Sequence, residues 1–184
     1  MEEEIEIEVK EQLERIEENG KELSWTKYLS LFTAIIAVIA AVASLASGSY
    51  SNEAVLEKNS AILYQNKASD QWSYYQAKGI KKNIADSFYT QFQAISFKKQ
   101  SDQYQIDQVD IKKQAEDFQK QVEDSNQKSE HFLQKHHKTS YSVTFFQIAI
   151  AFAALSALMK RRSFFYFSLA LALIGVGYLC SGVL

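Results

Sequence analysis

The chain has 184 residues, with no Pro, 6 Gly and one Cys, and its formal net charge at pH 7 is −2. The lack of Pro and the scarcity of Gly argue against a fold of strands and tight turns, which needs such residues about every 8–12 positions. A single Cys excludes an internal disulfide framework and a Cys-based zinc site, and the charge excludes a generally basic nucleic-acid binder.

Charged residues are distributed unevenly along the chain. Residues 1–47 carry 10 Glu and four basic residues, residues 48–141 carry 13 Lys and 12 acidic residues, and residues 142–184 carry only three charges. The three segments are therefore predicted to lie in three different solvents.

Residues 1–26, at the start of the first of these segments, are predicted to form an acidic amphipathic arm. Its Glu-rich start suits the positive end of a helix dipole, and its apolar residues recur at helical spacing. A solvated helix is the simplest interpretation. An anionic membrane surface would repel the arm, so a protein partner is the more plausible alternative. The apolar positions are Ile5, Val9, Leu13 and Ile16.

Three uncharged stretches are long enough to cross a bilayer as helices. They cover residues 29–47, 142–159 and 163–184, and about 20 helical residues span a hydrocarbon core of about 30 Å. Aromatic residues typical of membrane interfaces lie near their ends, at Trp25 and Tyr141 among others. The predicted transmembrane helices run over residues 27–48, 142–159 and 163–184.

Two other interpretations of these stretches stay open. Three core helices of a soluble protein would also be apolar, although such helices rarely lack a charged face over this length. The first stretch could instead be a signal peptide, because the small residues at 43–48 would suit a peptidase. The 28 residues before it are acidic, unlike the short basic start of a signal peptide, so we expect a retained anchor.

The connection between the second and third stretches predicts the orientation. It consists only of Lys160, Arg161 and Arg162, and short basic loops stay in the cytoplasm. The N-terminus is then cytoplasmic and residues 49–141 lie outside, which in a bacterium means the periplasm. The predicted location is therefore the bacterial inner membrane, with the lipid bilayer as one partner.

Residues 49–141 must leave the membrane and return to the same face. With no Pro and one Gly, the simplest all-α structure is a long antiparallel helical hairpin resembling a coiled coil. The polar run at residues 98–103 is the predicted turn, which gives two arms of about 40 residues and about 60 Å each. An apolar stripe on the outgoing arm needs covering: Ile80, Ile84, Phe88, Phe92 and Ile95.

Each arm carries a heptad-like pattern that predicts packing between arms or between subunits. On the outgoing arm, Asn52, Asn59 and Asn66 recur every seven residues, and a buried Asn fixes register and partner number at a cost in stability. A solvated polar face explains them equally well. Because both seams contain few large apolar residues for a hairpin that stands alone, we expect a homo-oligomer. The return-arm seam comprises Ile111, Ala115, Phe118, Val122, Ser125, Ser129 and Phe132.

Chemically active side chains are densest at residues 69–78. The Trp and Tyr side chains of this segment combine flat aromatic rings with groups that form hydrogen bonds. Such side chains suit a packing junction between helices and are also common in binding surfaces. One carboxylate without a base partner is not a mechanism, so we predict no catalytic residue and no enzyme. The candidate residues are Asp70, Gln71, Trp72, Tyr74, Tyr75, Gln76 and Lys78.

The three histidines give only a weak metal signal. His136 and His137 are adjacent, and adjacent residues point to different sides of a helix. Placement at the membrane interface is the simpler interpretation, and a weak inter-subunit metal or pH-sensing site is the alternative. No cofactor motif is present, so no metal or cofactor is predicted.

Residues 66–78, with the sequence NKASDQWSYYQAK, resemble the signature of the bacterial domain-of-unknown-function family 4337. The resemblance continues at His136 and His137, at residues 146–150 and at residues 160–162, and covers most of the chain beyond the acidic arm. It implies a small bacterial membrane protein with a span–coil–span–span layout. It implies no activity, substrate or catalytic residue. The Gln- and aromatic-rich centre of this chain departs from the Glu- and Ala-rich coil of the family.

These patterns predict a non-enzymatic, self-associating inner-membrane protein that acts as a scaffold or interaction module. The alternative is a channel-like or transport-accessory assembly of several copies, with Gln147, Ser156 and Ser168 as a polar strip facing a shared axis. The predicted spans contain no ionisable acid, Lys, Arg or His, which counts against an active transporter.

Overall fold

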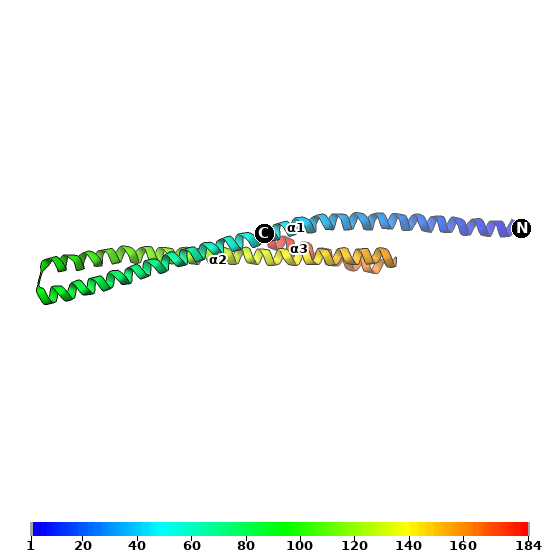
Figure 1. The fold of residues 1–184 in the computed structure, drawn as a ribbon. Helices are drawn as coiled ribbons and strands as arrows, with labels where there is room; N and C mark the ends of the chain where they lie inside the picture. Colours follow the sequence, from blue (N-terminus) through cyan, green and yellow to red (C-terminus); the bar gives the residue numbers. More distant parts are fainter. Residues whose placement is uncertain (1, 184) are drawn as a thin grey trace. The chain divides into compact units, whose positions relative to one another are not determined.

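The structure, a computed structural model, describes the backbone of residues 2–183 and the side chains of residues 10–15 and 25–183. It contains three helices: α1 (Glu2–Phe92), α2 (Ile95–Met159) and α3 (Arg162–Val183), shown in Figure 1. Over residues 2–183 there is no strand. The predicted all-α class is confirmed, and it follows from a sequence that offers almost no helix-breaking residue.

The chain leaves the helical conformation at only two points within residues 2–183. Gln93 (φ 54°) separates α1 from α2, and Lys160 (φ 50°) precedes α3. Both residues adopt the left-handed conformation that often ends a helix. The Gln93 N–H donates to the Tyr89 carbonyl at 2.8 Å. The turn predicted at residues 98–103 is therefore wrong, because these residues lie inside α2, where Lys98 pairs with Asp102 at 3.2 Å.

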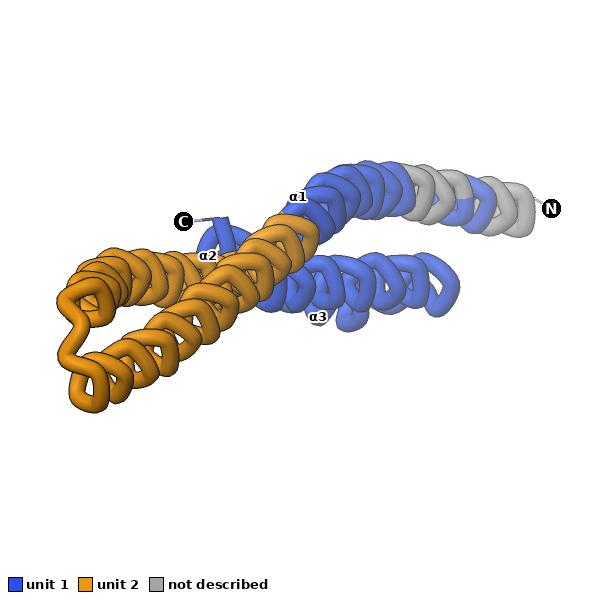
Figure 2. The backbone as a smooth tube through the Cα atoms, turned by 60° about the vertical axis from the view of Figure 1, so that its left-hand side comes forward, with its two compact units in different colours: residues 1–49, 134–184 blue, residues 50–133 orange. Residues whose placement is uncertain are grey.

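The helices are divided between two compact units (Figure 2). Unit 1 comprises residues 1–49 and 134–184, and unit 2 comprises residues 50–133. Unit 1 thus contains the N-terminal half of α1, the C-terminal part of α2 and all of α3. Unit 2 contains the rest of α1 and α2.

Small side chains allow the helices of unit 1 to pack closely. Phe146 is fully buried, and a Cβ atom added to Gly175 would lie 2.8 Å from its ring. Ser168 Oγ donates to the Ala149 carbonyl at 2.6 Å, which joins α3 to α2. Small residues at helix contacts let two backbones approach within packing distance. The buried core cluster consists of Ile36, Ala40, Ala43, Phe146, Ala149 and Ala172.

The outside of unit 1 carries large apolar side chains. Each of three helices contains a stretch long and apolar enough to cross a membrane, within Trp25–Phe92, Ile95–Met159 and Arg162–Val183. In these stretches many large apolar side chains are exposed, while most buried positions are Ala, Ser or Gly, an arrangement that water would penalise and that lipid tolerates. Exposed aliphatic examples are Leu31, Val38, Val42, Leu45, Leu158 and Leu173.

In unit 2, α1 packs against α2 through a seam of small residues on α1. Ala54, Ala61 and Ala68 recur every seven residues and are 6%, 3% and 0% exposed. Partners run in opposite order along the two helices, since Ser129 Oγ donates to the Ala54 carbonyl at 2.8 Å and Lys78 pairs with Asp107. Figures 1 and 2 both show these segments side by side.

The N-terminal arm is part of α1. Of the four apolar positions predicted for its amphipathic face, Leu13 is described and is 61% exposed. The side chains of Ile5, Val9 and Ile16 lie outside the described residues.

Candidate functional site

The strongest polar contact between the helices of unit 2 joins Lys78 on α1 to Asp107 on α2. Lys78 Nζ lies 2.6 Å from Asp107 Oδ2, and the two side chains are 15% and 28% exposed. Gln103 Nε2 donates to the other carboxylate oxygen at 2.8 Å. Both oxygens of Asp107 therefore accept a hydrogen bond, which favours its ionised form.

Two aromatic rings, one from each helix, lie near the Lys78 ammonium group. Its Nζ lies 5.3 Å from the ring centroid of Tyr74 and 5.2 Å from that of Tyr104, within cation–π range. The hydrogen bond with Asp107 raises the pKa of Lys78. The same bond, with a second from Gln103, lowers the pKa of Asp107. The pair is therefore charged over the whole physiological pH range.

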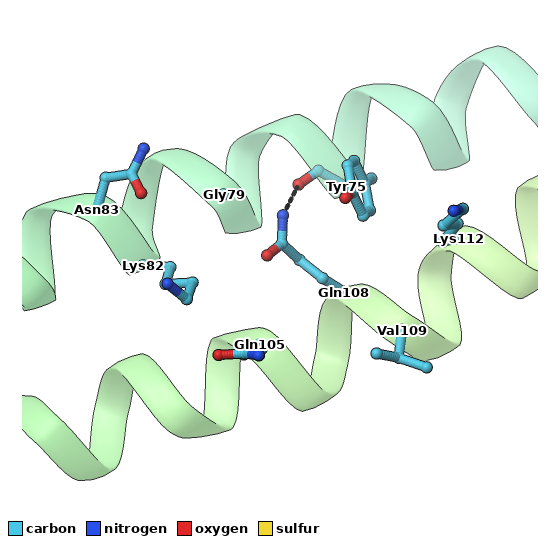
Figure 3. A pocket seen from close by; sticks show the side chains of 8 residues that line it. All are labelled: Tyr75, Gly79, Lys82, Asn83, Gln105, Gln108, Val109 and Lys112. Atoms are coloured by element: carbon cyan, nitrogen blue, oxygen red, sulfur yellow. Dashed lines mark hydrogen bonds between the residues drawn. The ribbon is translucent and has the colours of Figure 1, made fainter.

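One turn further along α1, an open hollow of about 500 Å³ lies between the two helices (Figure 3). Gln108 reaches across from α2 and donates to the Tyr75 carbonyl at 3.2 Å. Gly79 gives this amide room, since a Cβ atom there would lie 2.9 Å from Gln108 Nε2. The lining is Tyr75, Gly79, Lys82, Asn83, Gln105, Gln108, Val109 and Lys112.

The chemistry of this region suits a junction between helices. Its polar groups are amides, one ion pair and phenol rings, which can bind and orient a neighbouring helix. Among the described residues there is no group of three or more His, Cys, Asp or Glu placed to hold a metal ion. We call the residues that make these contacts the polar junction: Tyr74, Tyr75, Lys78 and Gly79 of α1 with Gln103, Tyr104, Asp107 and Gln108 of α2.

The structure brings only some residues of the predicted cluster into the polar junction. Tyr74, Tyr75 and Lys78 belong to it, whereas Asp70 and Gln76 are exposed. Trp72 is half-buried, with its ring 5.7 Å from that of Tyr75 in an edge-on contact. Gln71 is also half-buried, and its Oε1 atom is buried with no hydrogen-bond partner among the described residues.

Sequence reasoning missed the α2 half of the polar junction. Gln103, Tyr104, Asp107 and Gln108 were not singled out, because nothing in a single sequence fixes which residue of the second helix faces Lys78. The Gln103–Asp107 spacing of four was a usable signal, since it places an amide beside a carboxylate on one helix face.

The residues predicted for oligomer or arm packing fall on two different surfaces. Asn52, Asn59 and Asn66 are exposed, so they take no part in the contact between α1 and α2. On α2, Ile111 is buried, and the other predicted positions face the same way: Phe118, Val122 and Phe132 are half-buried, and Phe118 stacks on Tyr64 of α1 at 6.4 Å.

A second polar contact joins α1 and α2 inside unit 1. Ser47 Oγ lies 2.7 Å from Ser140 Oγ and 3.0 Å from His136 Nδ1. The same ring nitrogen lies 2.9 Å from the Ser47 carbonyl. His136 is thus held by a serine of the neighbouring helix, and the adjacent His137 is exposed.

The basic connection lies near an aromatic group of α1 in unit 1. Arg162 stands over the Trp25 ring, with Cζ 5.2 Å from the centroid. Ser156 Oγ donates to the Arg161 carbonyl at 3.0 Å, and Lys160 takes the left-handed conformation. The start of the first apolar stretch and the basic connection therefore lie together in this unit.

The fold defines an all-α protein with three helices long and apolar enough to cross a membrane. The chain belongs to the family described as Domain of unknown function (DUF4337), which it matches over residues 25–184. No curated protein and no solved structure matches it. The resemblance seen in the sequence is confirmed as family membership.

Proposed function

We propose that this protein is a non-enzymatic scaffold of the bacterial inner membrane that self-associates through its extramembrane segment. In this proposal three spans anchor residues 49–141, which form an antiparallel helical hairpin. The hairpin carries one seam that joins its own arms and a second seam that joins it to another copy.

A single observation carries the proposal: α1 has two heptad seams in unit 2, and among the described residues one is buried against α2 while the other is exposed. The first consists of Ala54, Ala61 and Ala68 and packs on α2. The second alternates spacings of three and four over Asn52, Val55, Asn59, Ile62 and Asn66, and its apolar members Val55 and Ile62 are 56% and 52% exposed. We call this second surface the free seam.

The composition of the free seam favours a second copy of the same chain as its partner. Alternating polar and β-branched residues at spacings of three and four are the pattern of a coiled-coil face, in which facing Asn side chains can pair. In a parallel pair, Asn59 of one copy would meet Asn59 of the other, and each amide would gain a partner. A shift of three or four residues would bury an amide against Val55 or Ile62 and leave it unsatisfied.

Membrane anchoring is supported by the surface of unit 1. Leu45, Leu158 and Leu173 are 78%, 83% and 65% exposed, whereas the buried positions are mainly Ala, Ser and Gly. Such a surface fits lipid because lipid needs no polar exterior. The contact of Trp25 with Arg162 supports a common membrane side for the N-terminal end of the first span and for the basic connection, which short basic loops place in the cytoplasm.

The hairpin is supported by the pairing of residues far apart in sequence. Lys58 Nζ donates to Asn126 Oδ1 at 2.9 Å, and Lys78 pairs with Asp107. Contacts of this order require the chain to reverse between Phe92 and Ile95. The extramembrane part then consists of two arms of roughly 40 residues, each about 60 Å long.

The channel-like alternative receives less support. It needs a polar strip open to a shared axis, but Ser156 and Ser168 are fully buried and each donates to a backbone carbonyl of the same chain. Of the three residues in the strip, only Gln147 is exposed. One exposed amide per copy makes a poor lining for a conducting path.

The test is the oligomer mass of the full-length protein in a mild detergent, by light scattering or native mass spectrometry. We expect a defined oligomer for the wild type. The double variant Asn59→Leu, Asn66→Leu removes the amides that set partner number, so the size should change or become mixed. The matched control, Gln114→Leu with Gln121→Leu, changes two exposed amides seven residues apart on α2 and should keep the wild-type size.

Two outcomes would refute the proposal. A monomeric wild type would remove self-association altogether. An unchanged mass in the Asn59 and Asn66 variant would show that the free seam does not determine the assembly. Helix content by circular dichroism checks that each variant is folded.

A further inference from the structure

We propose that the end of unit 2 at the α1–α2 connection docks on the surface of an anionic phospholipid bilayer. We call residues 80–103 the tip. The inference goes beyond the scaffold role and does not rest on self-association.

The tip exposes a continuous group of apolar side chains. Phe88 stacks on Phe92 at 6.0 Å and on Phe97 of α2 at 5.3 Å, so the rings join the two helices. Phe92 and Ile95, on either side of the connection, are nevertheless 60% and 71% exposed. Exposed aromatic and aliphatic side chains gathered in one patch mark an interaction surface.

The charge of the tip favours an anionic partner. It contains four Lys and two Asp, a net charge of +2. The two acids already lie beside lysines, Asp86 with Lys82 at 2.9 Å and Asp102 with Lys98 at 3.2 Å. Lys81 and Lys99 are exposed and form no ion pair among the described residues.

The negative charge of Asp86 is offset by Lys82, whose Nζ lies 2.9 Å from Asp86 Oδ2. Hydrogen bonds from Ser101 and Lys82 lower the pKa of Asp86. Ser101 is 1% exposed, so this bond ties the end of α1 to the start of α2 from the inside. The lysines of the tip that form no ion pair within the described part of the chain, Lys81 and Lys99, then leave its exposed apolar side chains beside positive charge.

A second copy of the chain does not account for this patch. A partner helix lying along the free seam of α1 would follow α1 only to its end at Phe92. Ile95 and Lys99 come after the connection, on α2, and would stay uncovered. A bilayer interface accepts Phe and Ile without a shaped pocket, while the ammonium groups of lysines meet lipid phosphates.

The test uses the full-length protein in phosphatidylcholine nanodiscs, mixed with vesicles and floated on a density gradient. We expect co-flotation with vesicles that contain phosphatidylglycerol and little with pure phosphatidylcholine vesicles. Phe92→Asp with Ile95→Asp should reduce binding by roughly tenfold or more, because it removes apolar contact and adds negative charge. The control, Ile106→Asp with Val109→Asp, changes two residues of α2 that are 59% and 67% exposed and should bind as the wild type does.

A second measurement reports contact directly. The chain has one Cys, so Cys180→Ser with Ile95→Cys gives a single position for an environment-sensitive fluorophore. We expect a blue shift on adding phosphatidylglycerol vesicles, and no shift when the label is placed by Ile106→Cys instead. The proposal is overturned if the wild type fails to bind, if the tip variant binds equally well, or if the fluorophore responds only to an added acidic protein.

Discussion

Gly175 of α3 lies directly over the buried ring of Phe146 in α2, so closely that a Cβ atom would stand 2.8 Å from Phe146 Cε1. The contact involves the main chain of one helix and the side chain of the other, so neither group can retreat easily. It fixes how closely α3 can approach α2 in unit 1.

We therefore expect Gly175→Ala to destabilise the packing of unit 1. Overpacking of this kind costs about 1–3 kcal/mol, and thermal unfolding of the full-length protein in detergent should show it. Gly177 is the matched control, because nothing lies within 4 Å of its added Cβ. Gly177→Ala should be neutral or slightly stabilising, and equal effects of the two substitutions would contradict the packing shown here.

The Lys78–Asp107 pair predicts how the stability of unit 2 depends on pH. The pKa of Asp107 is lowered, so its contribution is present above the ordinary carboxyl pKa and is lost as pH falls through the lowered value. The pKa of Lys78 is raised, so its contribution is present below the ordinary ammonium pKa and is lost as pH rises through the raised value.

Asp107→Asn should therefore lower the unfolding temperature at neutral pH and flatten both flanks of the pH profile. Circular dichroism melts across a pH series would measure this. Asp110→Asn, at an exposed site on the same helix, serves as the control and should keep the wild-type profile. If the unfolding temperature of the mutant depended on pH as that of the wild type does, at both low and high pH, the pair would contribute nothing to stability.

The alanine seam of α1 predicts a sharp difference between buried and exposed alanines. Ala68 is fully buried against α2, so Ala68→Leu should force the helices apart at a cost of about 1–3 kcal/mol. Ala77 is exposed, and Ala77→Leu should leave unit 2 as stable as before. Denaturant unfolding would reveal an error in the assigned seam if Ala68→Leu were the milder change.

The serine contact in unit 1 predicts a modest effect. Ser47 is 6% exposed and meets both His136 and Ser140. Ser47→Ala should cost about 0.5–1.5 kcal/mol, because it leaves one polar partner short of a hydrogen bond. Ser44 is exposed on the same helix, and Ser44→Ala should have no measurable effect in the same thermal assay.

The helix class could be predicted because nearly every residue of this chain tolerates a helix. The position of the reversal could not. The predicted turn at residues 98–103 is rich in polar residues, but Lys98 and Asp102 stabilise a helix at a spacing of four. Helix α1 ends instead at Phe92, and Gln93 takes the left-handed conformation that sequence patterns associate with Gly or Asn.

The alanine seam that packs on α2 was not singled out in the sequence, for a related reason. Asn59 and Ile62 form the more conspicuous heptad pattern, whereas Ala61 and Ala68 look neutral in any hydrophobicity pattern. Close helix packing selects small side chains as readily as large apolar ones, and a single sequence does not reveal which face a partner helix covers. The pattern on α2 was easier to interpret because Ile111 and Phe118 are large, and both face α1.

Half of the polar junction was visible in the sequence, because Tyr74 and Lys78 lie one helical turn apart. Asp107 could be assigned to Lys78 only once the pairing of the two helices was known. This pairing depends on where α1 ends and α2 begins. The sequence pattern predicted that break at residues 98–103, several residues after the observed one.

The most direct test of self-association is cross-linking through the free seam in isolated membranes. In a Cys180→Ser background, Asn59→Cys places a thiol on the free seam and Gln114→Cys places one on α2. A short bis-maleimide should convert the Asn59→Cys protein to a species of twice the mass and leave the Gln114→Cys protein monomeric. Monomer alone at position 59, or equal yields at both positions, would contradict association through this face.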